Sequence, residues 1–352
     1  MSRVRETSVF VIGEAGSNWR AGTPERDRKL AEALIDAAAD AGCDAVKFQT
    51  YRADSVYVPN AGESSYLASA GIEQPITEIF RDLEMPYELI PHLARYCAER
   101  GVEFMSTPFS VADLEAVDPY VRRHKIASFE ITHVRLLEAV ARTGKPVILS
   151  TGASTPEDID TALSVLRENS VGPVCLLQCT SSYPAPPESL NLAVLPRLAE
   201  RYGVAVGLSD HSLDPVVAPV SAVALGAVVI EKHFTLHRAL PGPDHGFAVT
   251  PDELRRLVEA VRLAEAMRGA GEKVIVDAER ELHEFAQRRV QAIVPIKRGE
   301  PLLEGKNVGV LRPGKQRPGV RPSELPALLG HPATRDIELG DGIQPGDWDA
   351  TP

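Results

Sequence analysis

The feature that most constrains the fold is a regular alternation of short apolar segments with segments of helical periodicity. The predicted strands are Val9–Ile12, Ala45–Phe48, Glu103–Met105, Lys125–Ala127, Pro146–Leu149, Val174–Leu177, Val204–Gly207 and Ala227–Ile230. The amphipathic segments include Arg26–Ala41, Tyr87–Arg100, Pro156–Glu168, Leu190–Tyr202, Asp214–Leu225 and Pro251–Met267. Apolar strands separated by helices form parallel sheets that are covered on both faces. Because there are eight such units, we predict a closed (β/α)8 TIM barrel rather than an open doubly wound sheet.

The rest of the chain has a different pattern. A TIM barrel takes about 250 residues, so a chain of 352 residues leaves a tail. From Arg288 onward, the short predicted strands Val290–Val294 and Val308–Leu311 lie among Gly and Pro turns, which is typical of a small β-rich module. We therefore expect a catalytic barrel over residues 1–268, a linker over 269–287 and a β-rich domain over 288–352. The long segment Asp54–Leu83 is typical of a lid or a partner contact.

Composition and charge exclude several classes of partner. The net charge is −11 and no basic tract offsets it, which disfavours nucleic acid and anionic membranes as partners. No apolar run approaches the roughly 20 residues of a membrane span, and Ser8–Ile12 is too short for the core of a signal peptide. The four cysteines form no Cys-x-x-Cys pair. We therefore expect reduced, buried thiols in a cytoplasmic protein. The cysteines are Cys43, Cys97, Cys175 and Cys179.

Polar and charged side chains gather where the predicted strands end. In a TIM barrel the active site lies at the carboxyl ends of the strands, and all eight predicted strands contribute such residues. In strand order they include Glu14, Lys47 and Gln49, Thr107, Lys125 with Ser128 and Glu130, Ser150, Cys179 and Thr180, Ser209 and His211, and Glu231 with His233. A merely solvated end would show mixed turn residues without this repetition, so we predict an enzyme active site here.

Two lysines and three hydroxyl groups suggest a site for a small anion. Lys47 and Lys125, together with Thr107, Ser128 and Ser150, would supply cations and hydrogen-bond donors. Such a set suits a ligand that carries phosphate and carboxylate groups, because charge-assisted hydrogen bonds are the strong ones. The alternative for each lysine is a rim residue that extends its ammonium group to water. For Lys47 we favour the binding role, because this residue interrupts an apolar strand and a buried charge needs a partner.

Two histidines follow the last two predicted strands. His211 and His233 end neighbouring strands, so their imidazoles can share one ion. Two imidazoles with water, a carboxylate and substrate oxygens suit a divalent metal such as Mn²⁺, Mg²⁺ or Co²⁺, and few protein ligands leave the open positions that catalysis needs. A lone histidine is more often structural, but a pair at matching strand ends favours a metal.

These residues belong to motifs that occur in the order of a known family. The motifs are Glu14-x-Gly-x-Asn18, Lys47-Phe48-Gln49, Ser106-Thr107-Pro108-Phe109, Lys125-Ile126-x-Ser128-x-Glu130, Leu149-Ser150-Thr151-Gly152, Cys179-Thr180-x-x-Tyr183-Pro184, Gly207-Leu208-Ser209-Asp210-His211, Glu231-Lys232-His233-Phe234-Thr235 and Gly242-Pro243-Asp244-His245. The chain resembles the N-acetylneuraminate (sialic acid) synthase family, which includes legionaminate, pseudaminate and spore-coat polysaccharide synthases. The tail, with Asn307 and Leu311-Arg312-Pro313-Gly314, resembles that family's antifreeze-like (SAF) domain.

The resemblance implies a role for each candidate residue. It implies that Lys47, Thr107, Lys125, Ser128 and Ser150 bind phosphoenolpyruvate and that His211 and His233 bind the metal. It implies catalytic roles for Glu14, Glu130 and Gln49, and sugar contacts for Tyr183, Ser209, Asp244 and Arg312. Arg312 is similar to an arginine that the SAF domain of one subunit inserts into the barrel of its neighbour, so a domain-swapped homodimer is expected.

The implied reaction is a metal-dependent condensation of phosphoenolpyruvate with an amino-sugar aldehyde. An N-acylamino hexose similar to N-acetylmannosamine would give a sialic-acid-type nonulosonate and phosphate. The alternatives are condensation with another aldose to give a different higher-carbon sugar acid, a metal-dependent pyruvate aldolase, and a degenerate sugar-binding paralogue without activity.

Departures from the family pattern fall on the sugar side. They are Trp19, Ser181, His237 and Gly246-Phe247-Ala248. Either the acceptor sugar differs, with Trp19 reshaping its pocket through a large apolar face, or these outer positions have drifted.

Overall fold

The computed structural model describes residues 8–63 and 73–349. Residues 1–7 of the predicted barrel domain lie outside the described residues, as does the middle of the long segment Asp54–Leu83, over residues 64–72. The chain forms two compact units, Met1–Gly269 and Ala270–Pro352, and each is described by itself.

The first unit is built on eight parallel strands. They are β1 (Phe10–Gly16), β2 (Ala45–Thr50), β3 (Glu103–Pro108), β4 (His124–Ile126), β5 (Val147–Ser150), β6 (Val174–Cys179), β7 (Ala205–Asp210) and β8 (Val229–His233). The sheet order is β3-β2-β1-β8-β7-β6-β5-β4, so the first strand pairs with the last. The two end strands, β3 and β4, lie next to each other and complete the ring. The predicted TIM barrel is confirmed.

Most of the strands extend further than the apolar pattern predicts. β1 continues through Glu14, β7 through Asp210 and β8 through His233. Parallel pairing carries these polar residues within the ladder, since Glu14 pairs with both Lys47 and His233. The chemical groups are therefore held by sheet hydrogen bonds rather than by loops, which makes their spacing rigid.

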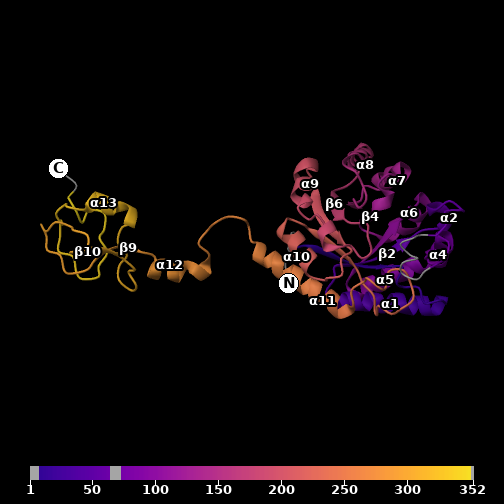
Figure 1. Ribbon diagram of the computed structural model, residues 1–352, viewed down its shortest axis with the longest axis horizontal. Coiled ribbons are helices and arrows are strands. Elements are labelled where there is room, and N and C mark those ends of the chain that lie inside the picture. Colours follow the sequence, from indigo (N-terminus) through magenta and orange to yellow (C-terminus); the bar gives the residue numbers. More distant parts are fainter. Residues whose placement is uncertain (1–7, 64–72, 350–352) are drawn as a thin grey trace. The chain divides into compact units, whose positions relative to one another are not determined.

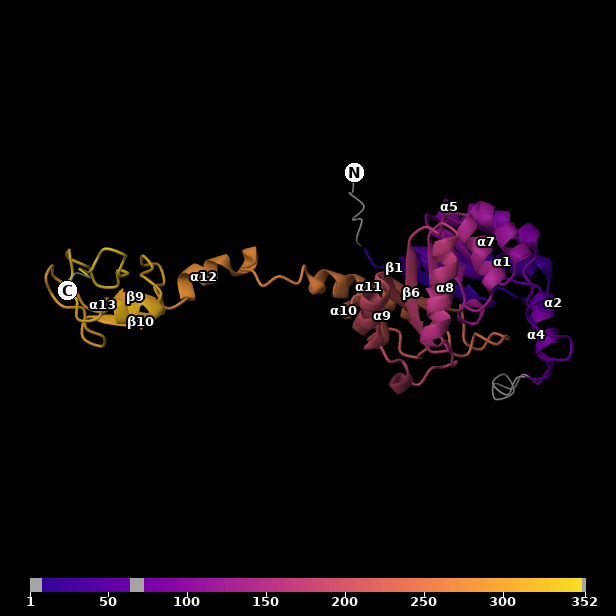
Figure 2. The same cartoon turned by 90° about the horizontal axis from the view of Figure 1, so that it is seen from above.

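Helices surround the strands (Figure 1) and lie outside them when the molecule is turned (Figure 2). They are α1 (Pro24–Ala41), α5 (Ile90–Arg100), α6 (Val111–Val117), α7 (Val134–Arg142), α8 (Pro156–Glu168), α9 (Val194–Tyr202), α10 (Val217–Ala224) and α11 (Pro251–Arg268). The shorter 3₁₀ turns are η1 (Tyr87–Leu89), η2 (Asp118–Tyr120), η3 (Ser128–Glu130) and η4 (Pro187–Ser189). α8 begins as its sequence predicts, because Thr155 and Asp158 form a capping box around Pro156.

Two apolar layers stabilise the barrel. Residues between strands and helices form the large core, which includes Trp19 at 1% exposure. A second cluster fills the barrel interior, so the barrel is a packed core and not a pore. Its buried members are Ile12, Ala45, Met105, Ile148, Cys175, Leu177 and Val229. All four cysteines are buried and unpaired, as expected.

The described parts of the long segment after β2 contain two short helices, α2 (Ala53–Val56) and α4 (Ile76–Asp82). An ion pair of 2.7 Å between Asp54 and Arg81 joins them. Ile76, Ile79 and Leu83 pack on Tyr51 in a small separate cluster. This segment is therefore fixed to the barrel next to the end of β2.

The second unit has a core of its own. It contains η5 (Asp277–Glu279), α12 (Arg280–Ala286), β9 (Arg289–Ala292), β10 (Val308–Leu311), η6 (Pro322–Glu324) and α13 (Leu325–Leu328). β9 and β10 are antiparallel, and Val290, Leu302, Val308 and Ile343 are among its buried apolar residues. Over residues 8–63 and 73–349, no helix has the length and apolar character that crossing a membrane requires.

Candidate active site

A small cavity lies at the carboxyl ends of the barrel strands. Its lining combines cations, hydroxyls, carboxylates and imidazoles that come from all eight strands or the turns after them. The lining residues are Glu14, Lys47, Gln49, Thr107, Lys125, Ala127, Ser128, Phe129, Ser150, Cys179, Tyr183, Ser209, His211, Glu231 and His233. The structure therefore brings most of the predicted site residues into one cavity.

Lys47 is held on one side of the cavity by acceptors from three strands. Its Nζ lies 2.6 Å from Glu14 Oε2 and 3.7 Å from Glu231 Oε1, and it donates to Thr107 Oγ1 at 3.1 Å. Gln49 Nε2 donates to the other oxygen of Glu14 at 3.0 Å. Lys47 is only 3% exposed, and the interruption of the apolar strand predicts a buried lysine with partners.

Lys125 approaches the same carboxylate from β4. Its Nζ donates to Ser150 Oγ at 2.7 Å and lies 3.9 Å from Glu231 Oε1. Ser209 Oγ donates to that same oxygen at 3.2 Å. Glu231 thus lies between the two ammonium groups, and its other oxygen, Oε2, is buried without a hydrogen-bond partner. A buried acceptor of this kind is suited to a donor from a ligand or from water.

Burial sets the protonation of these groups. Burial raises the pKa of Glu14 to about 7, although Lys47 opposes the shift. Burial also lowers the pKa of Lys125. Removing a charge from water disfavours the charged form in each case. Close to neutral pH, Glu14 is therefore partly protonated and the two lysines are not fully neutralised by carboxylates, which leaves the cavity attractive to an anion.

The two histidines meet at the tips of β7 and β8. Their ring centroids are 5.4 Å apart. Nδ1 of His211 lies 2.8 Å from the carbonyl oxygen of Thr180, a bond in which the N–H of Nδ1 donates, so Nε2 keeps its lone pair. Nδ1 of His233 is buried without a hydrogen-bond partner, and burial lowers the pKa of His233 well below its usual value.

This arrangement fits a divalent metal ion. A neutral imidazole with one nitrogen fixed by a carbonyl is the usual form of a histidine ligand. Within the part of the chain that the structure describes, no three His, Cys, Asp or Glu side chains gather as a complete metal site. Water and substrate oxygens would therefore complete the coordination, as in sites that keep open positions for chemistry.

Aromatic rings form the wall beside the histidines. The Tyr183 ring lies 4.2 Å from that of His211 and 5.3 Å from that of Phe247, and Phe247 lies 5.1 Å from His233. The structure thus brings Phe247, one of the departures from the family pattern, into contact with two lining residues. Trp19, by contrast, is buried in the barrel core and does not line the cavity.

Three predicted site residues do not line the cavity. Glu130 is buried at the end of the turn η3, and burial raises its pKa to about 7. Asp244 lies beside the cavity, 3.9 Å from His233 Nδ1 and accepting from Ser17 Oγ at 3.2 Å. Arg312 is exposed directly after β10 and belongs to the second unit.

Four lining residues carry no assigned role in the sequence prediction: Ala127, Phe129, Cys179 and Glu231. Glu231 is the anionic centre of the lysine pair, and Cys179 Sγ lies 3.9 Å from His211 Nδ1. Both are among the strand-end residues of the predicted active site, and the period of two along a strand places Glu231 on the same face as His233. The sequence analysis places Cys179 at a strand end and expects a buried, reduced thiol there, without a catalytic role.

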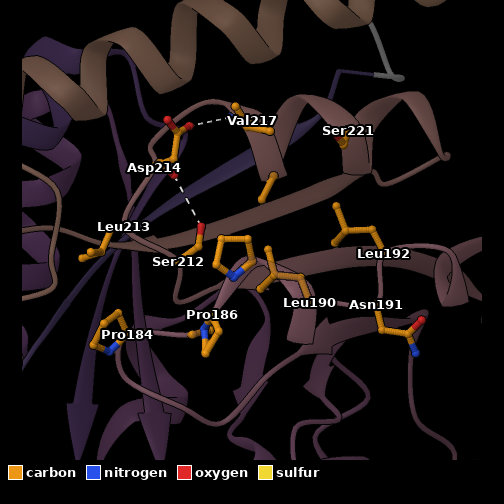
Figure 3. Close-up of a pocket in the computed structure, with 13 residues that line it drawn as sticks. Pro184, Pro186, Leu190, Asn191, Leu192, Ser212, Leu213, Asp214, Val217 and Ser221 are labelled. Atoms are coloured by element: carbon orange, nitrogen blue, oxygen red, sulfur yellow. Dashed lines mark hydrogen bonds between the residues drawn. The ribbon is translucent and has the colours of Figure 1, made fainter.

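A larger groove is lined in part by residues that follow Tyr183 and His211 in the chain. It measures about 640 Å³ and is lined mainly by proline and aliphatic residues, with Ser212 and Asp214 among the few polar ones (Figure 3). Its lining contains neither lysine nor histidine. The smaller cavity is therefore the one with the chemical groups of an active site.

Comparison with known proteins agrees with this geometry. A model described as the NeuB family matches residues 34–273. The chain belongs to the NeuB family. It is 40% identical to the spore coat polysaccharide biosynthesis protein SpsE of Bacillus subtilis, over 98% of this chain and 94% of that one. It is 36% identical to a pseudaminic acid synthase of Campylobacter jejuni, over 97% of each chain.

A solved NeuB-type structure has the same fold. The N-acetylneuraminic acid synthetase of Leptospira borgpetersenii serovar Hardjo-bovis has a TM-score of 0.70 and 34% identity, covering 79% of this chain and 91% of that one. The predicted family is thereby confirmed. So is the predicted class of enzyme, a sialic-acid-synthase-like transferase that uses phosphoenolpyruvate to form a carbon–carbon bond.

Proposed function

We propose that this NeuB protein condenses phosphoenolpyruvate with an N-acylamino hexose, in a metal-dependent reaction that gives a sialic-acid-type nonulosonate and phosphate. The observation that carries the proposal is the meeting of two buried lysines with two imidazoles in one cavity. The two lysines would bind the anionic groups of phosphoenolpyruvate. The two imidazoles would hold the ion that binds the aldehyde oxygen. Relatives named pseudaminic acid synthase and N,N'-diacetyllegionaminic acid synthase support the product class.

The lysine side of the cavity would bind phosphoenolpyruvate. Lys47 and Lys125 supply cations, and Thr107, Ser128 and Ser150 supply hydroxyls. Because these groups are already fixed by Glu14 and Glu231, they need little reorganisation when phosphate leaves, and preorganised charge is the usual basis of such catalysis. The partly protonated Glu14 reduces the repulsion that an arriving anion would meet.

The opposite side would hold the acceptor sugar. Tyr183, with Phe247 packed against it, offers a ring, and Gln49 offers a polar contact, while Asp244 lies next to His233. His211 and His233 would hold the divalent ion, which supplies a Lewis acid for the aldehyde oxygen when it is bound. Water would attack C2 before phosphate leaves by C–O cleavage.

The second unit would complete the site in a dimer. We propose that it is an SAF domain and that Arg312 of one copy reaches the acceptor in the barrel of the other. The exposure of Arg312 at the end of β10 supports a role in contact with another surface. A domain-swapped homodimer would follow.

The test is phosphate release from phosphoenolpyruvate in the presence of Mn²⁺ and a panel of 2-acetamido and 2,4-diacetamido hexoses. We expect release that depends on one of the sugars, with a nonulosonate identified by mass spectrometry. Consumption of phosphoenolpyruvate with no sugar accepted would contradict the proposal. Formation of pyruvate from a nonulosonate, without phosphate chemistry, would identify an aldolase instead.

A further inference from the structure

The tips of β7 and β8 make three consecutive side-chain pairs. The backbone register joins Ser209 to Glu231 and Asp210 to Lys232, and the next residues along the strands are the two histidines. Because side chains alternate along a strand, the first and third pairs face the cavity and the second pair faces away from it. The backbone ladder between the strands ends at the second pair.

The side chains of Asp210 and Lys232 link β7 and β8 at the point where their backbone pairing ends. Lys232 Nζ lies 2.6 Å from Asp210 Oδ2 and donates to the carbonyl oxygens of Ser212 and, at 3.2 Å, Asp214. Asp210 Oδ1 in turn accepts from the backbone N–H of Ser212 at 2.9 Å. The Lys232 side chain is only 2% exposed, so water does not compete for these bonds.

These contacts hold the backbone on both sides of His211. The residues before and after it, Asp210 and Ser212, are both bound to Lys232, and Lys232 immediately precedes His233. One ammonium group therefore ties the backbone that carries the first imidazole to the backbone that carries the second. The carbonyl oxygen of His211 also accepts from the N–H of Ala185 at 2.9 Å.

The loop that Lys232 holds is supported otherwise by backbone hydrogen bonds, in which Asp214 Oδ1 accepts from the N–H groups of Val216 and Val217. Ser212, Leu213 and Asp214 border the 640 Å³ groove (Figure 3), and Leu213 is 54% exposed. One side of the loop faces this groove, and Lys232 binds the loop from the side of the strands. A buried ion pair is in general weak evidence for stability, so its presence here favours a role in geometry.

We propose that Lys232, paired with Asp210, is a positioning residue that fixes the separation and orientation of the His211 and His233 imidazoles. It contacts neither substrate, because its side chain lies outside the cavity. The inference rests on the proposed function, since a fixed pair of imidazoles matters most for a shared divalent ion. Groups that orient metal ligands typically contribute about 10- to 100-fold in metal affinity.

The main test variant is the double substitution Asp210→Asn with Lys232→Met. It removes the ion pair without leaving a buried unpaired charge, which a single Lys232→Met substitution would do. The matched control is Arg262→Met, which removes another ion pair of 2.6 Å, between Arg262 and Asp44, away from the strand tips that carry the histidines. Circular dichroism and thermal unfolding establish that each variant is folded.

Direct Mn²⁺ binding is measured by electron paramagnetic resonance without substrates, and the KM for phosphoenolpyruvate is measured at saturating Mn²⁺. We expect the double variant to bind Mn²⁺ about 10-fold more weakly, with the KM for phosphoenolpyruvate within about twofold of wild type. We expect Arg262→Met to bind Mn²⁺ as wild type does. A folded double variant with unchanged Mn²⁺ affinity would overturn the inference.

A crystal structure of the double variant separates this inference from the proposed function. We expect the His211 ring to be displaced relative to His233, and an undisplaced ring would overturn the inference. If wild type binds no Mn²⁺, the metal in the proposed function is wrong, and the ring positions still decide the role of Lys232.

Discussion

At the scale of the residue, the site depends on charges that are buried before any ligand arrives. Lys47 and Lys125 are each surrounded by acceptors, so their positions are set by the folded protein. A solvent-exposed lysine side chain would instead lose conformational entropy when the ligand bound. The cavity is therefore organised for an anion in advance, and removing one ammonium group should affect catalysis far more than folding.

The substitution Lys125→Met tests this at one position. We expect kcat/KM for phosphoenolpyruvate to fall by about 10²-fold or more, since a preorganised charge in a dry site is lost. The matched control is Lys145→Met, which removes a lysine that pairs with Asp118 and does not line the cavity. Steady-state phosphate release measures both. If kcat/KM of the Lys125→Met enzyme stays within about threefold of the wild-type value, Lys125 does not bind phosphoenolpyruvate.

Glu130 should couple stability to pH. Burial raises its pKa from about 4.5 to about 7, so between these pH values the native state holds a proton that the unfolded state has released. The free energy of unfolding therefore falls as pH rises through this window. We expect the stability advantage of Glu130→Gln over wild type to be about 1–3 kcal/mol larger at pH 8 than at pH 5.

Urea unfolding at the two pH values measures this difference. The same substitution should impair turnover, because a group that is costly to bury is often retained for function. An equal stability difference at pH 5 and pH 8 would show that the carboxylate of Glu130 does not titrate between them.

Site residues could be recognised from the sequence where a charged residue interrupts an apolar strand. Lys47 lies between Val46 and Phe48, so its need for partners can be seen from the sequence. Glu231 shows no such signal, because its importance comes from two lysines on other strands. The side-chain environment of Trp19 was equally hidden, since the packing of a large ring depends on its neighbours in space.

At the scale of the element, strand bounds decide how firmly the site is held. The apolar pattern ends β8 at Ile230, whereas the structure continues it to His233. Hydropathy detects the apolar middle of a strand. It misses the end of the strand, because the residues there are polar and line the cavity. α8 and α11 were predictable almost to the residue, since Thr-Pro capping signals depend on local sequence alone.

The turn after β5 gives a prediction at this scale. A Cβ at Gly152 would lie 2.3 Å from Ser181 Oγ and 2.9 Å from Ser128 Oγ, and the N–H of Gly152 donates to that same Ser128 oxygen. We expect Gly152→Ala to lower the free energy of unfolding by about 1–3 kcal/mol, as overpacking does, and to raise the KM for phosphoenolpyruvate.

Two further variants control for this effect. Adding Ser181→Ala removes the closest atom, so the double variant should recover part of the lost stability. Gly246→Ala meets nothing within 4 Å and should change the free energy of unfolding by less than about 0.5 kcal/mol. Chemical denaturation measures all three, and a Gly152→Ala protein as stable as wild type would show that the turn can move aside.

At the scale of the whole molecule, the barrel carries the cavity, and the second unit has a separate core. The sequence predicts the barrel from a repeated local pattern, which is why that part of the fold is the most secure. It predicts the β-rich unit from turn residues and two short strands. The assembly of copies depends on surfaces rather than on periodicity, so only the resemblance suggested a swapped dimer.

Co-expression of two defective chains tests that dimer. Lys47→Met disables a barrel, and Arg312→Ala disables the arginine proposed to serve the neighbouring barrel. If Arg312 acts between copies, a mixed dimer contains one site with an intact barrel and an intact arginine. Random pairing in a twofold dimer then restores about a quarter of wild-type activity, although each variant alone is nearly inactive. Co-expressing Lys47→Met with His211→Ala, both in the barrel, should restore nothing. Mixed dimers of the first pair that stay inactive would mean that Arg312 serves the barrel of its own chain.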